Sequence, residues 1–147
     1  MRRLTSLLLF VLIGACASVP DAEKFKNHAA PTVRPDQALV FVYREDLLAF
    51  DSKKVLIQEG GKSLWLIPNG SVSYAYLAPG KHTLASYAWD IGGTEYTGDF
   101  EAGHSYYLKL VFKKFDPKLV LMEVAFERVE AVDAQSDMAD LRLTDHP

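Results

Sequence analysis

From residue 38 onward, short apolar runs alternate with turn-forming dipeptides, and this pattern limits the possible folds more than any other feature of the chain. Runs rich in Val, Ile, Leu, Tyr and Phe are interrupted about every ten residues by Gly-Gly, Asn-Gly, Pro-Gly or Ala-Gly. Gly and Asn accept positive φ angles and Pro fixes φ, so these dipeptides favour turns. The pattern is typical of antiparallel all-β domains and predicts seven to eight strands.

Each strand is expected to bury one face. The expected strands are residues 38–44, 55–58, 63–67, 72–77, 82–89, 94–100, 106–113 and 119–127. Two packed sheets bury one face of every strand, so we expect an antiparallel two-sheet sandwich over residues 38–128. Asn69-Gly70 suits the type I′ turn of a hairpin between the third and fourth strands. The tail, residues 129–147, is expected to lay a short helix on the sandwich.

The side-chain pattern of three runs predicts how they face the core. Residues 38–44 are almost continuously apolar, as in a central strand covered on both faces. Alternation in the last two runs predicts one buried and one exposed face. The side chains expected to face inward are Tyr106, Leu108, Leu110, Phe112, Val120, Met122, Val124 and Phe126. Those expected to face water are Lys109, Lys113, Glu123 and Glu127.

The beginning of the chain has the three parts of an export signal. Arg2 and Arg3 precede a short apolar stretch, residues 4–13, and small residues then lead to Cys16. The stretch is shorter than the about 20 apolar residues that a membrane span requires. Residues 1–15 are therefore expected to be a cleavable signal peptide.

The end of this signal, Ile13-Gly14-Ala15-Cys16, resembles the lipobox of bacterial lipoproteins. The resemblance implies a diacylglycerol on the sulfur of Cys16, cleavage before Cys16, and acylation of the new amino group. Cys16 is the only cysteine, and a lone thiol in an exported protein also suits a reactive site or an intermolecular disulfide. Ala17 follows, which by the sorting of similar enterobacterial lipoproteins implies the outer membrane. We favour its periplasmic face.

Residues 16–37 separate the lipid from the first strand. They contain three prolines and no apolar period. We expect this segment to be a flexible tether with a reach of roughly 25 Å.

Charge and motifs exclude several functions. The net charge of −3 and the pI near 5.8 give no basic surface for nucleic acid. His82 and His104 lie beside turns, and with Asp99 or Glu101 they would form a metal site if their strands were neighbours. The alternative is that each histidine hydrogen-bonds a nearby carbonyl. Asp99 and Glu101 themselves form a stripe on one strand rather than a glycosidase cleft. Because no hydrolase or phosphate-loop motif is present, we expect neither an enzyme nor a cofactor.

Three other residues are candidates for binding. Arg44 ends the first strand, where it can clamp a ligand carboxylate or pair with a neighbouring acid such as Glu45 or Asp46. Tyr87 and Trp89 lie on the strand face opposite Leu84. If Leu84 points inward, both rings point outward as platforms for sugars or a protein; otherwise both rings belong to the core.

Four short motifs follow the lipobox along the chain. They are Val42-Tyr43-Arg44, Asn69-Gly70-Ser71, Pro79-Gly80-Lys81-His82-Thr83-Leu84 and Gly103-His104-Ser105-Tyr106-Tyr107. In this order they resemble the DUF2846 family of bacterial lipoproteins over residues 38–128. The resemblance implies a β-rich fold and no particular activity. The hairpin that follows the second strand reads Gln58-Glu59-Gly60-Gly61-Lys62 and departs from the family's usual "VDGK" pattern, which leaves the register of this hairpin open.

Together these features predict a membrane-anchored lipoprotein whose sandwich is a non-enzymatic protein-interaction module of the cell envelope. The alternative, which outward-facing Tyr87 and Trp89 would favour, is a glycan-binding module for peptidoglycan or lipopolysaccharide.

Overall fold

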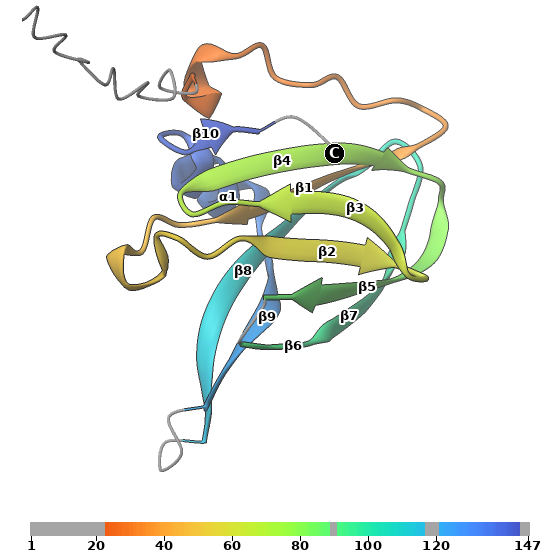
Figure 1. Cartoon of the computed structure of the whole chain (residues 1–147). Coiled ribbons are helices and arrows are strands. Elements are labelled where there is room, and N and C mark those ends of the chain that lie inside the picture. Colours follow the sequence, from red (N-terminus) through yellow and green to blue (C-terminus); the bar gives the residue numbers. More distant parts are fainter. Residues whose placement is uncertain (1–22, 89–90, 117–120, 145–147) are drawn as a thin grey trace, which may run out of the picture.

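A computed structural model describes residues 23–88, 91–116 and 121–144 of the chain. Its elements are η1 (Phe25–Asn27), β1 (Ala38–Arg44), η2 (Leu48–Phe50), β2 (Val55–Glu59), β3 (Lys62–Ile67), β4 (Ser71–Leu77), β5 (Gly80–Tyr87), β6 (Gly92–Gly93), β7 (Glu95–Phe100), β8 (Ser105–Asp116), β9 (Leu121–Val129), α1 (Ala131–Met138) and β10 (Arg142–Leu143). The strands form two packed sheets, which confirms the all-β sandwich (Figure 1).

The two sheets differ in strand direction. Sheet A has the order β10-β4-β1-β8-β9-β6, and sheet B has the order β3-β2-β5-β7. Sheet B is antiparallel throughout. Sheet A is mixed, because β1 pairs in parallel with β8, as do β10 with β4 and β6 with β9. The expectation of antiparallel pairing is therefore correct for all of sheet B and for the β1–β4 and β8–β9 pairs of sheet A. Apolar periodicity identifies the buried face of a strand but not the direction of its neighbour.

Strand β1 lies inside sheet A and is buried along its whole length, as its apolar sequence predicts. Val40 and Val42 face the core between the sheets. Leu39, Phe41 and Tyr43 face a second core on the other side of sheet A. Strand β1 therefore contributes side chains to both cores.

The main core between the sheets contains Trp65 of β3, Leu84 of β5 and Phe100 of β7, all fully buried or nearly so. The inward-facing side chains predicted for the last two runs are confirmed except Met122, which is half-buried and is not among the side chains of this core. Glu123, expected to face water, is half-buried too. The side chains that join this core are Tyr106, Leu108, Leu110 and Phe112 of β8, and Val124 and Phe126 of β9. Val120 lies outside the described residues. Lys113 and Glu127 form an ion pair of 2.9 Å on exposed positions.

The second core lies under α1, the short C-terminal helix that the sequence predicts. The helix buries Ala134 and Met138 against the face of sheet A that carries Phe41. Its Asp137 covers Lys109 of β8, whose ammonium group lies 3.0 Å from the carboxylate. Only 18% of the Lys109 side chain is exposed. The expectation that Lys109 faces water is therefore wrong, because the helix packs on that face.

Asn69-Gly70 forms a turn, but the hairpin expected there is wrong. Gly70 has the expected positive φ of 61°. However, β3 belongs to sheet B, while β4 pairs with β1 in sheet A. The turn therefore carries the chain from one sheet to the other, since a positive φ reverses the backbone without requiring the flanking strands to pair.

The structure gives the register of the β2–β3 hairpin, which the sequence left open. Gly60 and Gly61 form its turn with φ angles of 54° and 79°. The pairing shifts between Ile57 and Gln58, where a β-bulge lies.

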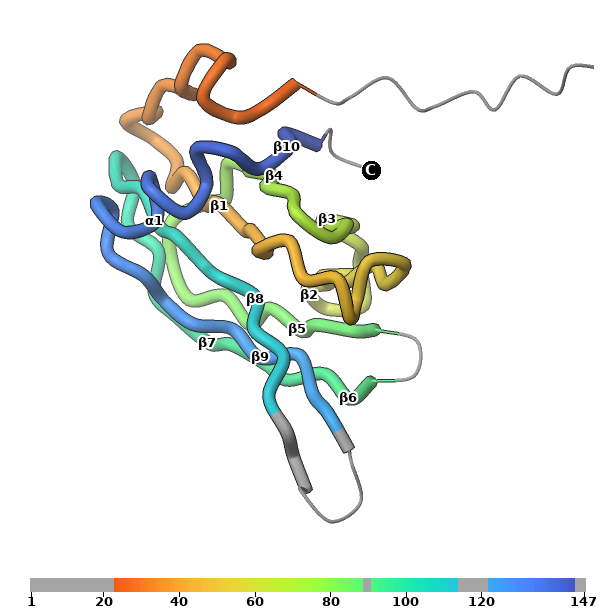
Figure 2. The backbone as a smooth tube through the Cα atoms, turned by 90° about the vertical axis from the view of Figure 1, so that its left-hand side faces the viewer, coloured from red at the N-terminus to blue at the C-terminus, as the bar shows by residue number. Residues whose placement is uncertain are grey.

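Much of the segment expected to be a flexible tether is packed on the domain. The backbone N–H groups of Phe25 and Lys26 donate to the carbonyls of Leu141 and Ala139, at 2.7 and 3.1 Å. The Phe25 ring meets Phe41 edge-on, with centroids 6.0 Å apart. Figure 2 shows this orange segment running beside β10.

The later part of the same segment is also held. The Arg34 guanidinium lies 3.8 Å from the centroid of the Tyr76 ring, and the Tyr76 hydroxyl donates to the Thr32 carbonyl at 2.8 Å. The tether prediction is therefore wrong for residues 23–37. Residues 16–22 lie outside the described residues.

The two sheets are joined along one side by Ser86 of β5. Its N–H donates to the Thr94 carbonyl at 2.9 Å, and its hydroxyl donates to the Val124 carbonyl of β9 at 2.8 Å. Thr94 also donates its N–H to Val124 at 3.1 Å. Sheet B therefore continues into sheet A at this corner.

Candidate functional site

The outer face of sheet B carries a row of three apolar side chains, of which two are exposed and one, Leu56, is half-buried. In the strand register, Leu56 of β2 lies opposite both Leu66 of β3 and Tyr87 of β5. Leu66 is 42% exposed and Tyr87 is 52% exposed. Their chain neighbours Trp65 and Ile57 are fully buried, so strand alternation turns the row away from the core.

This row forms the floor of an open groove of about 520 Å³, which we call the Tyr87 groove. The groove is lined by Ser52, Lys54, Leu56, Leu66, Tyr87 and Ala88. Most of this lining is apolar, and the residues with polar side-chain groups are Ser52, Lys54 and Tyr87. Such a surface suits apolar side chains that bring one or two polar partners with them.

The sequence identified only part of this groove. Tyr87 is exposed, as expected for the case in which Leu84 points inward, and Leu84 is fully buried. Trp89 lies outside the described residues. Leu56 and Leu66 were missed, because the run Leu64-Trp65-Leu66-Ile67 is apolar at every position and its alternation is hidden.

Arg44 does not line the groove and is fully buried. Its two terminal nitrogens donate to the carbonyls of Phe50 and Lys53, both at 2.7 Å. Its guanidinium also lies 4.6 Å from the centroid of the Phe112 ring. Burial lowers the pKa of Arg44, an effect that nearby Asp46 opposes. Arg44 thus fixes the loop of residues 45–54, and its described contacts are with backbone carbonyls rather than with a neighbouring acid.

The two central histidines do not lie on neighbouring strands, because His82 lies in β5 of sheet B and His104 directly precedes β8 of sheet A. The ring nitrogens of His82 lie 2.8 Å from the Ala78 carbonyl and 2.6 Å from the Glu59 carboxylate. A ring nitrogen of His104 lies 3.1 Å from the Ala102 carbonyl. Each histidine therefore bonds a nearby carbonyl, which was the second alternative.

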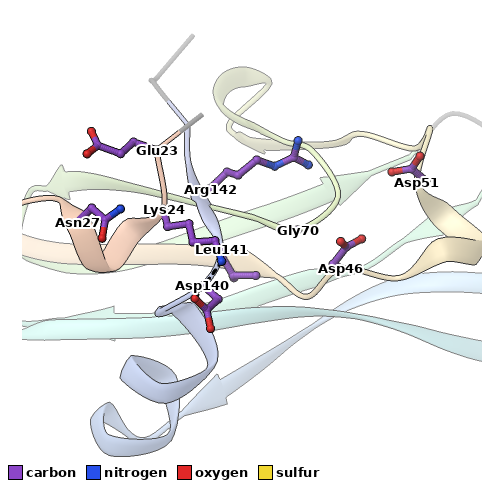
Figure 3. A pocket seen from close by; sticks show the side chains of 9 residues that line it. All are labelled: Glu23, Lys24, Asn27, Asp46, Asp51, Gly70, Asp140, Leu141 and Arg142. Atoms are coloured by element: carbon purple, nitrogen blue, oxygen red, sulfur yellow. Dashed lines mark hydrogen bonds and ion pairs between the residues drawn. The ribbon is translucent and has the colours of Figure 1, made fainter. Parts of the chain in front are cut away.

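A larger, polar cavity of about 700 Å³ lies at the end of the molecule that holds residue 23 (Figure 3). Lys24 forms an ion pair with Asp140 at 3.2 Å, and Arg142 donates to the Asn69 carbonyl at 2.7 Å. The remaining charged lining is acidic. Within the described ranges, no three His, Cys, Asp or Glu side chains are arranged to hold a metal ion.

The lipidation candidate, Cys16, precedes the described residues. Among the helices that the structure describes, none has the length and apolarity to cross a membrane. A scan against protein-family models and a search of the curated proteins found no match to this chain.

Proposed function

We propose that this chain is an outer-membrane lipoprotein, anchored through Cys16, whose sandwich binds another envelope protein in the Tyr87 groove. The observation that carries the proposal is the outward-facing row of Leu66, Leu56 and Tyr87, in which the two outer side chains are exposed. Three large apolar side chains in register on one sheet face form a patch that gains free energy when a partner removes it from water. Aromatic side chains in such patches are frequent centres of protein interfaces.

The lining of the groove indicates the chemistry of the partner. Leu56 and Leu66 favour an apolar side chain, and Lys54 at the rim favours a carboxylate close to it. Strand β3 is an edge of sheet B, so an extended partner segment can lie beside Leu66 and continue the row. We therefore expect a segment with alternating apolar residues and an acidic residue.

A glycan-binding module remains the second candidate, and the exposed ring of Tyr87 favours it. Sugar rings stack on aromatic faces but also need several polar partners. Two of the three side chains in the row are leucines, which supports a protein partner over a glycan.

The anchoring part of the proposal rests on residues 1–16 and on the resemblance to DUF2846 lipoproteins. The two turn motifs that the resemblance quotes, Asn69-Gly70 and Pro79-Gly80, occupy connections between the sheets, with φ angles of 61° and 129° at their glycines. We propose membership of that family on this basis.

Site-specific photocrosslinking in cells tests the groove. A photoreactive phenylalanine derivative at Tyr87 should crosslink to one envelope protein. The same group at Thr83, an exposed position on the same strand face, should not. Leu66→Asp should abolish the Tyr87 crosslink, because a carboxylate on the floor must be desolvated when the partner binds.

Three results would count against this function. They are a crosslink that survives Leu66→Asp, a crosslink of equal strength from Thr83, and the absence of any crosslink. Binding of the purified protein to cell-wall sacculi that Tyr87→Ala abolishes would favour the glycan-binding module instead.

A further inference from the structure

The loop of residues 45–54 exposes two leucines on a rigid base. Leu48 is 94% exposed and Leu47 is 38% exposed. Next to them, Phe50 is stacked on Phe112 with ring centroids 4.2 Å apart. Arg44 holds the carbonyls of Phe50 and Lys53, and the Leu47 N–H donates to the Asn69 side chain at 3.1 Å. The leucines are therefore held outward by a fixed loop.

This loop lies at the end of the molecule from which the chain leads back to Cys16. Asp46 and Asp51 of the loop line the same cavity as Glu23, the first described residue (Figure 3). The turn between β7 and β8, which contains Glu101, lies at the opposite end in both overall views (Figures 1 and 2). An anchor attached close to Glu23 therefore brings the 45–54 loop toward the membrane.

The linker to that anchor is short, because residues 23–37 are packed on the domain. Cys16 is seven residues before Glu23 (23 − 16 = 7), and a fully extended chain of that length spans at most about 25 Å. A flexible one has a typical reach of about 15 Å. A domain of this size is wider than either distance, since its radius of gyration alone is about 14 Å. The surface around Glu23 therefore cannot turn far from the bilayer.

We infer that the 45–54 loop rests on the bilayer that holds the anchor, with Leu47 and Leu48 inserted between the lipid headgroups. This inference depends on the lipidation of Cys16 in the proposed function. The loop carries three acids, Glu45, Asp46 and Asp51, against the two lysines Lys53 and Lys54, so it has no net positive charge to attract anionic headgroups. The surface that fits is accordingly a zwitterionic phospholipid such as phosphatidylethanolamine. Contact here would also hold the adjacent Tyr87 groove, which shares Ser52 and Lys54 with this loop, close to the membrane.

Depth-dependent fluorescence quenching tests this contact on the whole acylated protein. In Leu48→Cys the new thiol is the only free one, since Cys16 is blocked by lipid, and it can carry an environment-sensitive fluorophore. In vesicles of phosphatidylethanolamine and phosphatidylcholine we expect blue-shifted emission and quenching by brominated acyl chains, with a depth of about 5–10 Å. Glu101→Cys, at a side chain that is 75% exposed at the opposite end, is the control and should remain unquenched.

The outcomes separate this inference from the proposed function. Mass spectrometry of the same samples reports acylation of Cys16. An acylated protein whose Leu48 label is not quenched overturns the membrane contact and leaves the anchor intact. Blue-shifted emission without quenching by brominated lipid also overturns it, because a second copy of the chain then covers the loop. A protein without acyl mass overturns both the anchor and the contact.

Discussion

Among the described glycines, Gly93 is the one where an added methyl group would meet the closest neighbouring atom. It lies at the corner where Ser86 joins the two sheets. A Cβ atom at this position would lie 1.6 Å from the backbone carbonyl oxygen of Ser86. Neither group can move independently, because that segment of β5 is also bonded to Thr94 and Val124.

We therefore expect Gly93→Ala to lower the free energy of unfolding by about 3 kcal/mol or more, the upper range for an overpacked site. Gly92→Ala is the matched control, since its Cβ would meet the Met122 carbonyl oxygen at an ordinary 3.5 Å. Urea denaturation followed by tryptophan fluorescence measures both variants. Equal stability of the two variants would contradict the close packing described here.

Arg44 illustrates how far single residues can be predicted. A charged residue that ends an apolar strand signals a fixed role, and the sequence identified it for that reason. Its partners are the backbone carbonyls of Phe50 and Lys53. Every residue type has a backbone carbonyl. No side-chain pattern marks such acceptors, so the sequence suggested carboxylates instead. Tyr87 was easier to place, because strand alternation relative to one buried leucine determines its face.

Helix α1 is attached to sheet A through a polar cluster. The hydroxyl of Tyr43 donates to Asp137 at 3.0 Å, and the ammonium of Lys109 binds both Asp137 and Glu45. Burial raises the pKa of Tyr43, and the hydrogen bond to Asp137 raises it further. Partial burial alone lowers the pKa of Lys109, but its hydrogen bonds to Glu45 and Asp137 outweigh this effect and raise it.

This cluster predicts a loss of stability at alkaline pH. Both groups hold their protons more tightly in the folded state than in the unfolded state. Their contribution is complete below about pH 10, and it decreases as the pH rises through the raised folded-state values. Tyr43→Phe should lower stability by about 1–3 kcal/mol at neutral pH and flatten the decline above pH 10, as measured by urea denaturation at several pH values.

The matched control is Tyr107→Phe, on the neighbouring strand and packed against the same core. It should keep the steep alkaline decline of the unchanged protein. A Tyr43→Phe variant with that same steep decline would show that the cluster does not set the alkaline stability.

At the scale of elements, the sequence predicts strands better than their partners. The strand runs, the central position of β1 and the helix α1 follow from apolar content and spacing. The sheet crossing at Asn69-Gly70 does not, because positive φ angles form the same turn inside a hairpin and between sheets. The packing of residues 23–28 is equally hidden. It depends on backbone hydrogen bonds, on ion pairs of Lys24 and Lys26 with Asp140 and on the ring of Phe25, none of which produces an apolar period.

For the whole molecule, the central prediction concerns Cys16. Mass spectrometry of the mature protein should find its N-terminus at Cys16 with acyl mass attached. Cys16→Ser should leave the precursor uncleaved, because a hydroxyl is a far poorer nucleophile than a thiolate for forming the lipid linkage. The sandwich should still fold, since Cys16 precedes it and no second cysteine exists to form a disulfide. An unmodified thiol or a different mature N-terminus would overturn the lipoprotein assignment.

The contact of Phe25 and Lys26 with Leu141 and Ala139 also sets the order in which the molecule is completed. A chain that emerges from its N-terminus cannot complete the docking of residues 23–28 until residues 139–141 have arrived. The first part to be synthesised is therefore the last to dock. In the proposed lipoprotein, the linker from Cys16 therefore reaches its short final length, and the domain is drawn to the bilayer, only after residues 139–141 are in place.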